Sequence, residues 1–254
     1  MQEKFLILDA DKSLSSIGGD TGAKALSGVE PLKITQGMLQ IRGFIDQLFT
    51  RVIQKTKHPL FIGVVEETVV VPSPLCKEMN LNGIVLDTIS HTFRQDMRIL
   101  EKAQKSGQLE MQDWGKLERL YNEAIMMLVA LPTWVIVNCH SDYDKDQSTG
   151  MFYYYPGVKG STKATMIDYF DVVCYTKASR DGKKNYTWQT YADASKFAKD
   201  RLGILEGIMP QDFSVIIEAY RSKGIKNPKI LVVGESGTGK TRALASLSKL
   251  TINQ

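Results

Sequence analysis

The sequence has few of the residues that build disulfide or zinc sites. Its 254 residues include three cysteines, Cys76, Cys139 and Cys174, and three histidines. The cysteines are odd in number and widely spaced, and Cys139 and Cys174 lie inside apolar runs, which favours buried reduced thiols over disulfides. The histidines and cysteines do not cluster as zinc ligands do. We therefore expect neither a disulfide framework nor a zinc centre.

Long apolar runs are absent as well. No run approaches the roughly 20 residues that a membrane-spanning helix needs. The first residues, Met1-Gln2-Glu3-Lys4-Phe5, lead into a strand-like segment without the apolar region of a signal peptide. We therefore expect a cytoplasmic protein with no membrane partner. The net charge of +4, from 32 basic and 28 acidic residues, is compatible with a nucleic-acid partner but does not point to one.

Short β-rich runs alternate with helical segments along the chain. A length of 254 residues with 43% hydrophobic side chains is enough to bury a sizeable core. We expect strands at 5–9, 60–71, 83–87, 133–139, 169–177, 185–191 and 229–233. Helices are expected at 38–55, 89–106, 111–129, 211–223 and 241–250, and Phe213, Ile216, Ile217 and Tyr220 share one face of the fourth.

This alternation predicts an α/β fold. The sheet is expected to be mainly parallel and flanked by helices, and Asp181-Gly182 between two strand-like runs predicts a hairpin that adds an antiparallel edge. There is no internal repeat and no low-complexity linker, so we expect one domain over residues 1–254.

A glycine-rich segment near the end of the chain carries the most specific pattern. Gly234-Glu235-Ser236-Gly237-Thr238-Gly239-Lys240-Thr241 follows the expected strand 229–233, and Thr241-Arg242 begins a helix. The glycines let backbone N–H groups converge on phosphates, Lys240 places a charge near the β- and γ-phosphates, and the Thr241 hydroxyl can coordinate Mg²⁺. The segment therefore predicts a phosphate-binding loop (P-loop) in which residues 234–242 bind ATP with Mg²⁺. The flanking strand and helix argue against the alternative, a chance glycine turn.

The position of the P-loop is unusual, because only residues 242–254 follow it. One short helix cannot complete a nucleotide-binding sheet. Joining residues 251–254 to residues 2–5 gives strand, P-loop, helix, short turn and strand 5–9, which is a conventional βαβ unit. We therefore predict a circularly permuted chain, with the P-loop strand and helix in a C-terminal segment, 224–254, and the original ends near 223–225. The alternative is domain swapping, in which this C-terminal segment completes the sheet of another molecule.

A second expected strand ends in a carboxylate. Residues 83–86 are a mostly apolar run that leads into Asp87, which is how P-loop enzymes present the Asp that holds the water shell of Mg²⁺. Asp87 and Thr241 are therefore the predicted metal-binding residues. The alternative for Asp87 is an N-terminal cap of the following helix, a role that Ser90 could fill instead.

Two further strands end in candidate catalytic residues. Asp9 and Asp11 lie at the carboxyl end of strand 5–9, at the sheet edge where ligands bind in such folds. Either could orient the attacking water as general base, and Asp11 is the preferred candidate. His140, after strand 133–139, could sense the γ-phosphate, and a buried hydrogen-bonded histidine is the equal alternative. Lys240, Asp11 and His140 are thus candidates for catalysis.

In the circular order the chain resembles the RecA-like phage ATPases, including the short RecA-like proteins associated with single-strand annealing. The resemblance covers most of the chain and rests on the P-loop, Asp9-Ala10-Asp11 and residues 84–88. Weaker matching segments are Asp113-Trp114-Gly115-Lys116-Leu117, Asn138-Cys139-His140, Pro156-Gly157-Val158-Lys159-Gly160 and Tyr169-Phe170-Asp171-Val172-Val173. The resemblance implies a RecA-like P-loop fold and ATP hydrolysis, in the host cytoplasm if the chain is phage-encoded. The family pattern often has Glu where this chain has Asp11.

Lys199-Asp200-Arg201 resembles the Lys-x-Arg element of RecA-like ATPases and hexameric helicases. In that family the two cations reach the γ-phosphate of a neighbouring subunit and stabilise charge in the transition state. The resemblance therefore implies that Lys199 and Arg201 act in trans within a homo-oligomer, a ring or a filament. A solvated Lys/Arg pair is the alternative.

Residues 140–161 are expected to form a long irregular segment that carries four successive aromatic residues, 152–155. The corresponding loop of RecA-like folds tends to contact DNA, and aromatic side chains can stack on unpaired bases. Basic residues that could contact phosphates are Lys159, Lys163, Arg180, Lys183 and Lys184. Three aspartates in the same segment, Asp142, Asp144 and Asp146, argue against such a contact.

The sequence therefore favours a circularly permuted RecA-like ATPase of phage type that acts on single-stranded DNA in recombination or annealing. A nucleotide-dependent switch or assembly module without DNA contact is the alternative. A GTPase is disfavoured because no Asn-Lys-x-Asp segment is present, and the nearest tetrad, Lys226-Asn227-Pro228-Lys229, does not fit.

Overall fold

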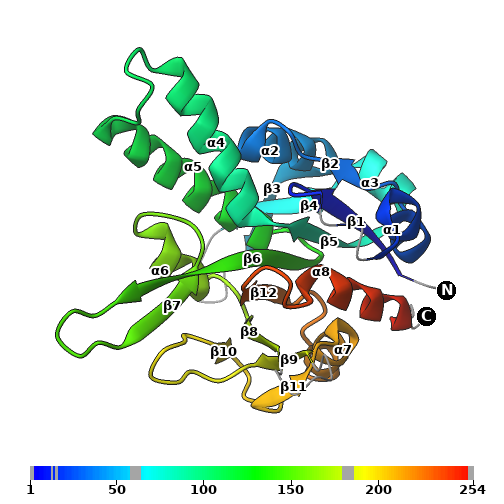
Figure 1. Cartoon of the computed structure of the whole chain (residues 1–254). Helices are drawn as coiled ribbons and strands as arrows, with labels where there is room; N and C mark the ends of the chain where they lie inside the picture. The colour runs from blue at the N-terminus through cyan, green and yellow to red at the C-terminus, as the bar shows by residue number, and fades with distance from the viewer. Residues whose placement is uncertain (1–2, 13, 15–16, 58–63, 179–185, 251–254) are drawn as a thin grey trace.

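The computed structural model describes residues 3–12, 14, 17–57, 64–178 and 186–250. Ten strands form one sheet (Figure 1): β1 (Lys4–Asp9), β2 (Leu32–Lys33), β5 (Leu81–Asp87), β6 (Trp134–Lys145), β7 (Phe152–Pro156), β8 (Val172–Ala178), β9 (Tyr186–Gln189), β10 (Lys199–Asp200), β11 (Ile208–Pro210) and β12 (Lys229–Gly234). A separate antiparallel ribbon contains β3 (Phe49–Lys57) and β4 (Val64–Pro72).

The P-loop strand β12 lies in the middle of the large sheet. The strand order is β11-β9-β8-β12-β6-β5-β1-β2. β12 is parallel to both of its neighbours, β6 and β8, and the parallel arrangement continues through β5 and β1 to β2. β9 and β11 form an antiparallel edge. The predicted mainly parallel sheet with an antiparallel edge is therefore confirmed, although the Asp181-Gly182 turn lies outside the described residues.

Helices cover both faces of this sheet. They are α1 (Gly19–Ser27), α2 (Gly37–Leu48), α3 (Pro74–Met79), α4 (Ile89–Ala103), α5 (Met111–Val129), α6 (Thr162–Asp168), α7 (Phe213–Ser222), α8 (Lys240–Ala243) and the 3₁₀ helix η2 (Leu244–Lys249). No helix within the described ranges is both long and apolar enough to cross a membrane.

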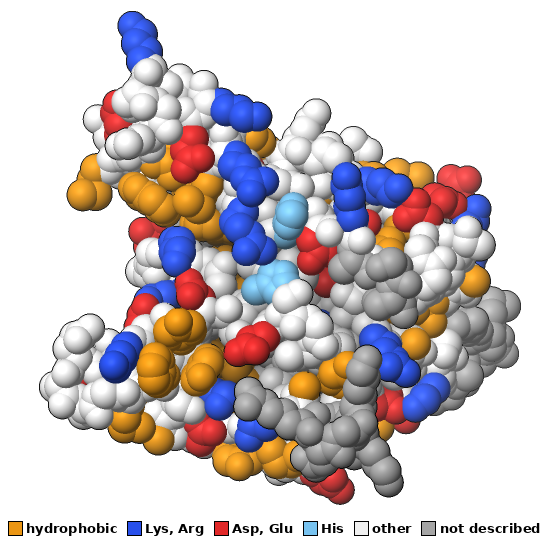
Figure 2. Space-filling view, in the orientation of Figure 1, with side chains coloured by type: hydrophobic (Ala, Val, Ile, Leu, Met, Phe, Trp, Pro, Cys, Tyr) orange, Lys and Arg blue, Asp and Glu red, His pale blue; other side chains and the backbone are white. Residues whose placement is uncertain are grey.

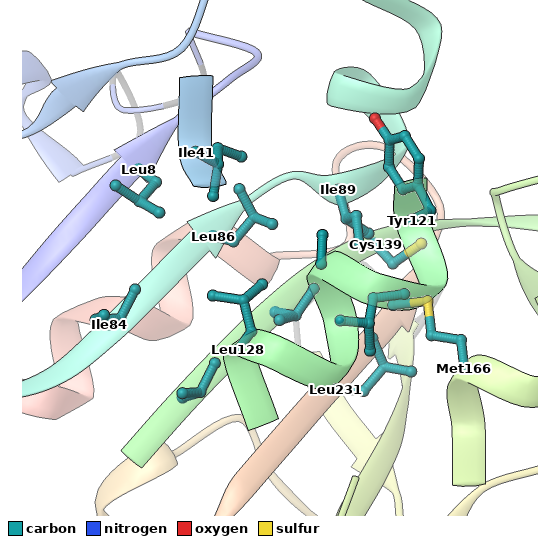
Figure 3. Close-up of a cluster of buried hydrophobic side chains, with 14 of the residues drawn as sticks. Leu8, Ile41, Ile84, Leu86, Ile89, Tyr121, Leu128, Cys139, Met166 and Leu231 are labelled. Atoms are coloured by element: carbon teal, nitrogen blue, oxygen red, sulfur yellow. The ribbon is translucent and has the colours of Figure 1, made fainter. Parts of the chain in front are cut away.

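The central strands are apolar along nearly their whole length because both of their faces are buried. Successive side chains point to opposite faces, so Leu6 and Leu8 of β1 join the cluster under α2 and α5, whereas Phe5 and Ile7 join the cluster under α1, α7 and η2. Figure 3 shows the first cluster, in which Leu8, Leu86 and Leu231 from three strands meet side chains from the helices.

The predicted apolar face of α7 is confirmed, because Phe213, Ile216, Ile217 and Tyr220 are all buried. The helix begins after Asp212, whose side chain accepts a hydrogen bond from the Ser214 N–H. α5 has the predicted bounds.

Two predicted segments differ from the structure. The helix expected over 38–55 ends at Leu48, because the β-branched residues that follow form β3, whose backbone pairs with β4. The prediction of an irregular segment at 140–161 is also wrong. β6 continues to Lys145 and pairs antiparallel with β7, with Ser141 opposite Pro156 and Lys145 opposite Phe152. We call this pair, residues 141–156, the aromatic ribbon.

The two ends of the described chain lie together (Figure 1). The Glu3 N–H donates to the Leu250 carbonyl at 3.5 Å. The Glu3 side chain is buried, accepts from Trp134 Nε1 at 3.0 Å and forms an ion pair with Arg221. The chain therefore returns from the P-loop through α8 and η2 to the start of β1, which is the neighbourhood expected for a βαβ unit.

Candidate nucleotide-binding site

The P-loop connects the carboxyl end of β12 to α8. A Cβ atom on Gly234 would lie 1.6 Å from Thr176 Oγ1, so no side chain fits there. Gly237 and Gly239 have φ angles of 77° and 87°, in the left-handed region that favours glycine. Gly234 is therefore required by the close approach of β8, and Gly237 and Gly239 are required by the tight turn of the loop.

Hydrogen bonds from two other elements hold the loop. Thr238 Oγ1 lies 2.6 Å from Thr176 Oγ1 of β8 and donates to the Glu235 carbonyl at 2.7 Å. Gln211 Nε2, from the turn before α7, donates to the Thr238 carbonyl at 2.9 Å. No sequence pattern pointed to Thr176 or Gln211, since each is a single polar residue that meets the loop only in the folded chain.

Lys240 lies beneath the P-loop with 5% of its surface exposed. Its Nζ donates to the Gly234 and Glu235 carbonyls at 2.7 and 2.8 Å. Burial lowers the pKa of Lys240 from its ordinary value, and the nearby Asp87 carboxylate acts in the opposite direction. The loop thus holds a cation where phosphate charge would concentrate.

Asp87 is fully buried at the end of β5. Its Oδ2 accepts from Thr241 Oγ1 at 2.7 Å, and its Oδ1 accepts from Asn138 Nδ2 at 3.0 Å. The N-terminal cap of α4 is Thr88, so the alternative capping role of Asp87, and of Ser90, is wrong. A hydroxyl and a carboxylate oxygen in contact are the ligand types that Mg²⁺ prefers, so this pair fits a Mg²⁺ ion.

A cavity of about 330 Å³ lies over the P-loop. Its lining includes Ser236, Gly237 and residues 239–242 of the loop, together with Asp11, Thr88, His140 and Tyr186. The structure therefore brings Asp11 and His140, which are far apart in the sequence, to the same cavity as Lys240 and Thr241. Thr88 and Tyr186 were not predicted.

Asp11 and His140 lie next to one another in the wall of the cavity. The His140 Nε2 lies 3.7 Å from Asp11 Oδ2, and the same oxygen accepts from Thr88 Oγ1 at 3.4 Å. The His140 backbone N–H donates to Ser90 Oγ at 2.9 Å, which fixes the middle of β6 against the start of α4. Asp9, the other candidate base, is buried beside Asp87 in the β1–β5 register, whereas Asp11 lines the cavity. The geometry therefore favours Asp11.

Lys199 and Arg201 lie elsewhere in the fold. Lys199 Nζ donates to the carbonyls of Ile167 and Asp168 at the end of α6, each at 3.1 Å. Arg201 forms an ion pair with Asp171 at 2.7 Å, and Asp171 lies beside the first residue of β12. The six-residue strand β12 therefore separates Arg201 from the P-loop of the same chain by about 17 Å. The structure does not bring these two cations to their own nucleotide site.

The predicted DNA-contacting lysines have partners within the chain. Lys159 forms an ion pair with Asp142 at 2.7 Å, and Lys163 pairs with Asp144. Two of the three aspartates that argued against a DNA contact are thus neutralised locally, whereas Asp146 accepts hydrogen bonds from Ser148 and Thr149. Arg180, Lys183 and Lys184 lie outside the described residues.

The fold and the site together define a P-loop nucleotide-binding protein. One family model, described as an AAA domain, matches residues 1–202. The chain belongs to this family, which indicates a nucleotide-binding ATPase of the AAA type. The matched residues end before the P-loop at 234–241. Comparisons with curated proteins and with solved structures gave no match.

Proposed function

We propose that this chain binds ATP with Mg²⁺ and hydrolyses it, and that it acts on single-stranded DNA in recombination or annealing, as its resemblance to RecA-like ATPases of phage type implies. One observation carries the proposal. The C-terminal P-loop, the ends of β1 and β5, and β6 at His140 converge on the cavity that Asp11, His140 and Lys240 line.

The residues that line the cavity have different proposed roles. The N–H groups of residues 234–242 and the Lys240 ammonium bind phosphate oxygens, while Thr241 and Asp87 hold Mg²⁺. An adjoining cavity of about 620 Å³, which shares Tyr186, Gly239 and Arg242 with the first, has room for the nucleoside. Bound Mg²⁺ would neutralise phosphate charge. Asp11 can then orient a water, and His140 can donate to a phosphate oxygen.

The DNA part of the proposal is supported by the aromatic ribbon. The strand that reaches the cavity at His140 continues outward into this ribbon, where Tyr143 and Phe152 are 59% and 43% exposed. Their rings pack edge to face with centroids 5.4 Å apart. Exposed aromatic rings of this kind stack on unpaired bases. DNA bound to the ribbon would therefore contact the same strand, β6, that carries His140.

Single-stranded DNA is expected to accelerate ATP hydrolysis, because it would contact the strand that carries His140. The measurement is phosphate release with Mg·ATP, with and without oligothymidylate. The double variant Tyr143→Ala/Phe152→Ala should keep the basal rate and lose the acceleration, whereas the matched variant Tyr191→Ala, another exposed aromatic, should keep both. A basal rate that DNA never changes would instead support the nucleotide-dependent switch.

The sequence order is proposed to be circularly permuted. Three observations support this: the central place of β12 in the sheet, the contact between Glu3 and Leu250, and a family match that ends at residue 202. The proposed original joint, residues 223–225, includes Gly224, an exposed turn glycine with a φ angle of 85°.

A rearranged chain tests this permutation. Joining residue 254 to residue 1 and opening the chain between Gly224 and Ile225 should leave the Kd for Mg·ATP within about threefold of the parent value, because exposed loops tolerate new termini. The matched control opens the chain between Ile84 and Val85 in the buried strand β5 and should not fold. If the first rearranged chain also fails to fold, the permutation is rejected.

A further inference from the structure

Three basic side chains form a row on α4. Arg94, Arg98 and Lys102 are four residues apart, so an α-helix places them about 6 Å from one another along its axis. All three are exposed, and within the described ranges none of them takes part in an ion pair. We call this row the α4 ridge. Figure 2 shows it as a blue band over α4 that ends near the pale-blue histidines.

The α4 ridge and the aromatic ribbon rise from the same edge of the sheet. α4 begins two residues after Asp87, and the ribbon begins one residue after His140. The hydrogen bond from the His140 N–H to Ser90 Oγ, 2.9 Å long, joins the two elements at their base. On the face shown in Figure 2 the surface is hollowed between the projecting α4–α5 pair and the ribbon. In Figure 2 the α4–α5 side of the hollow carries the blue band and, beside it, apolar side chains, and the ribbon with its exposed aromatic rings forms the other side.

The two walls differ in charge. Two of the three aspartates of the ribbon, Asp142 and Asp144, pair with Lys159 and Lys163, and Lys145 is next to the third in the sequence, so the charges of the ribbon largely cancel. The α4 ridge keeps its positive charge. Burial lowers the pKa of His91 on the same helix, the Asp11 carboxylate opposes this shift, and the positive charges of Arg94 and Arg98 lower the pKa further. An anion that enters the hollow is therefore attracted to the α4 side.

We propose that Arg94, Arg98 and Lys102 bind the backbone phosphates of a single-stranded nucleic acid whose bases stack on the aromatic ribbon across the hollow. This inference rests on the proposed function and adds a second wall to the DNA site. A row of cations follows a charged backbone, and the guanidinium groups match phosphate oxygens in pairs. Exposed rings such as Tyr143 and Phe152 favour splayed bases over an acidic polypeptide, which has no base to stack.

The test uses the full chain and fluorescence anisotropy of a labelled oligothymidylate between about 50 and 200 mM salt. The triple variant Arg94→Ala/Arg98→Ala/Lys102→Ala should weaken binding about tenfold or more and reduce the slope of log K against log salt by about 2, since each contact to a single strand adds about 0.7. The matched control, Lys77→Ala/Lys223→Ala/Lys226→Ala, removes the same charge from exposed positions at the opposite edge of the sheet and should change neither quantity. Calorimetric Mg·ATP affinity should be that of the parent in both variants, which also shows that they fold.

The possible outcomes distinguish a failure of this inference from a failure of the proposed function. If the parent chain hydrolyses ATP and binds the oligonucleotide but the ridge variant has an unchanged salt slope, only the proposed role of the α4 ridge is overturned. Equal losses in the ridge and control variants would show general charge attraction and also overturn it. Competition by polyglutamate at equal charge would overturn the choice of a nucleic acid, and a parent that binds no oligonucleotide would remove the DNA part of the proposed function as well.

Discussion

Replacing Lys240 with alanine is expected to abolish tight binding of Mg·ATP. The Lys240 ammonium is buried under the P-loop and is held by the Gly234 and Glu235 carbonyls. Its removal leaves concentrated phosphate charge without its nearest cation. Truncating one partner of a buried, hydrogen-bonded charge pair costs about 2–5 kcal/mol, so the Kd should rise at least about thirtyfold. Isothermal titration calorimetry measures this directly.

The Lys240 experiment has a matched control on the chain. Lys226→Ala removes one exposed lysine just before β12 and should leave the Kd unchanged. The thermal unfolding midpoint of Lys240→Ala, measured without nucleotide, shows whether the variant is folded. If the folded variant binds Mg·ATP as the parent does, residues 234–241 are not a phosphate-binding loop.

Replacing Arg201 with alanine is expected to leave ATP binding nearly intact and to remove most turnover. Arg201 lies at the amino end of β12, far from its own P-loop, and half of its side chain is exposed. It can therefore reach a γ-phosphate only across an interface with a second copy. A cation of this kind stabilises charge that develops in the transition state, and its loss can lower kcat by about 10³.

Two comparisons separate this trans role from a structural role. Asp171→Asn weakens the ion pair with Arg201 but keeps an acceptor for the Lys229 N–H. If Arg201 only stabilises the fold, both variants should lower turnover and unfolding midpoint alike. If Arg201 acts in trans, only Arg201→Ala should lose turnover, and mixing it with Lys240→Ala should restore part of it. Turnover that does not depend on protein concentration, without rescue on mixing, would leave the chain as a monomeric nucleotide binder.

The parts of the site that the sequence predicted are those with a local pattern. Glycines between an apolar strand and a helix, as at Gly234 to Thr241, define a backbone conformation within a few residues. Asp87 and His140 could be placed because each lies where the parallel pairing of a buried strand ends, and the carboxyl ends of parallel strands meet at one edge. The residues that sequence reasoning missed, Asn138 and Thr176 among them, contact the site only through tertiary packing.

The errors in secondary structure have similar causes. The prediction extends the helix through residue 55, whereas the β-branched residues after Phe49 and their pairing with β4 form a strand. The sequence did contain a signal for the hairpin turn of the aromatic ribbon, because Asp, Ser and Gly follow one another closely at 146–150 and such residues mark turns. In the structure Asp146 Oδ1 accepts from the Ser148 N–H at 2.7 Å in the turn between β6 and β7. Sequence order could not show that Lys199 and Arg201 lie at the amino edge, since β10 reaches it by pairing with β8.

The central claim is that the C-terminal P-loop and the N-terminal strands form one nucleotide site within a single molecule. Hydrogen–deuterium exchange of the parent chain, with and without Mg·ATP and over a range of protein concentrations, tests it most directly. We predict that nucleotide protects residues 234–243 together with the segments that contain Asp11, Thr88 and His140, and that the protection at saturating nucleotide does not change on dilution to monomer. Protection confined to residues 234–243, or protection of the N-terminal segments that disappears on dilution, would contradict the claim.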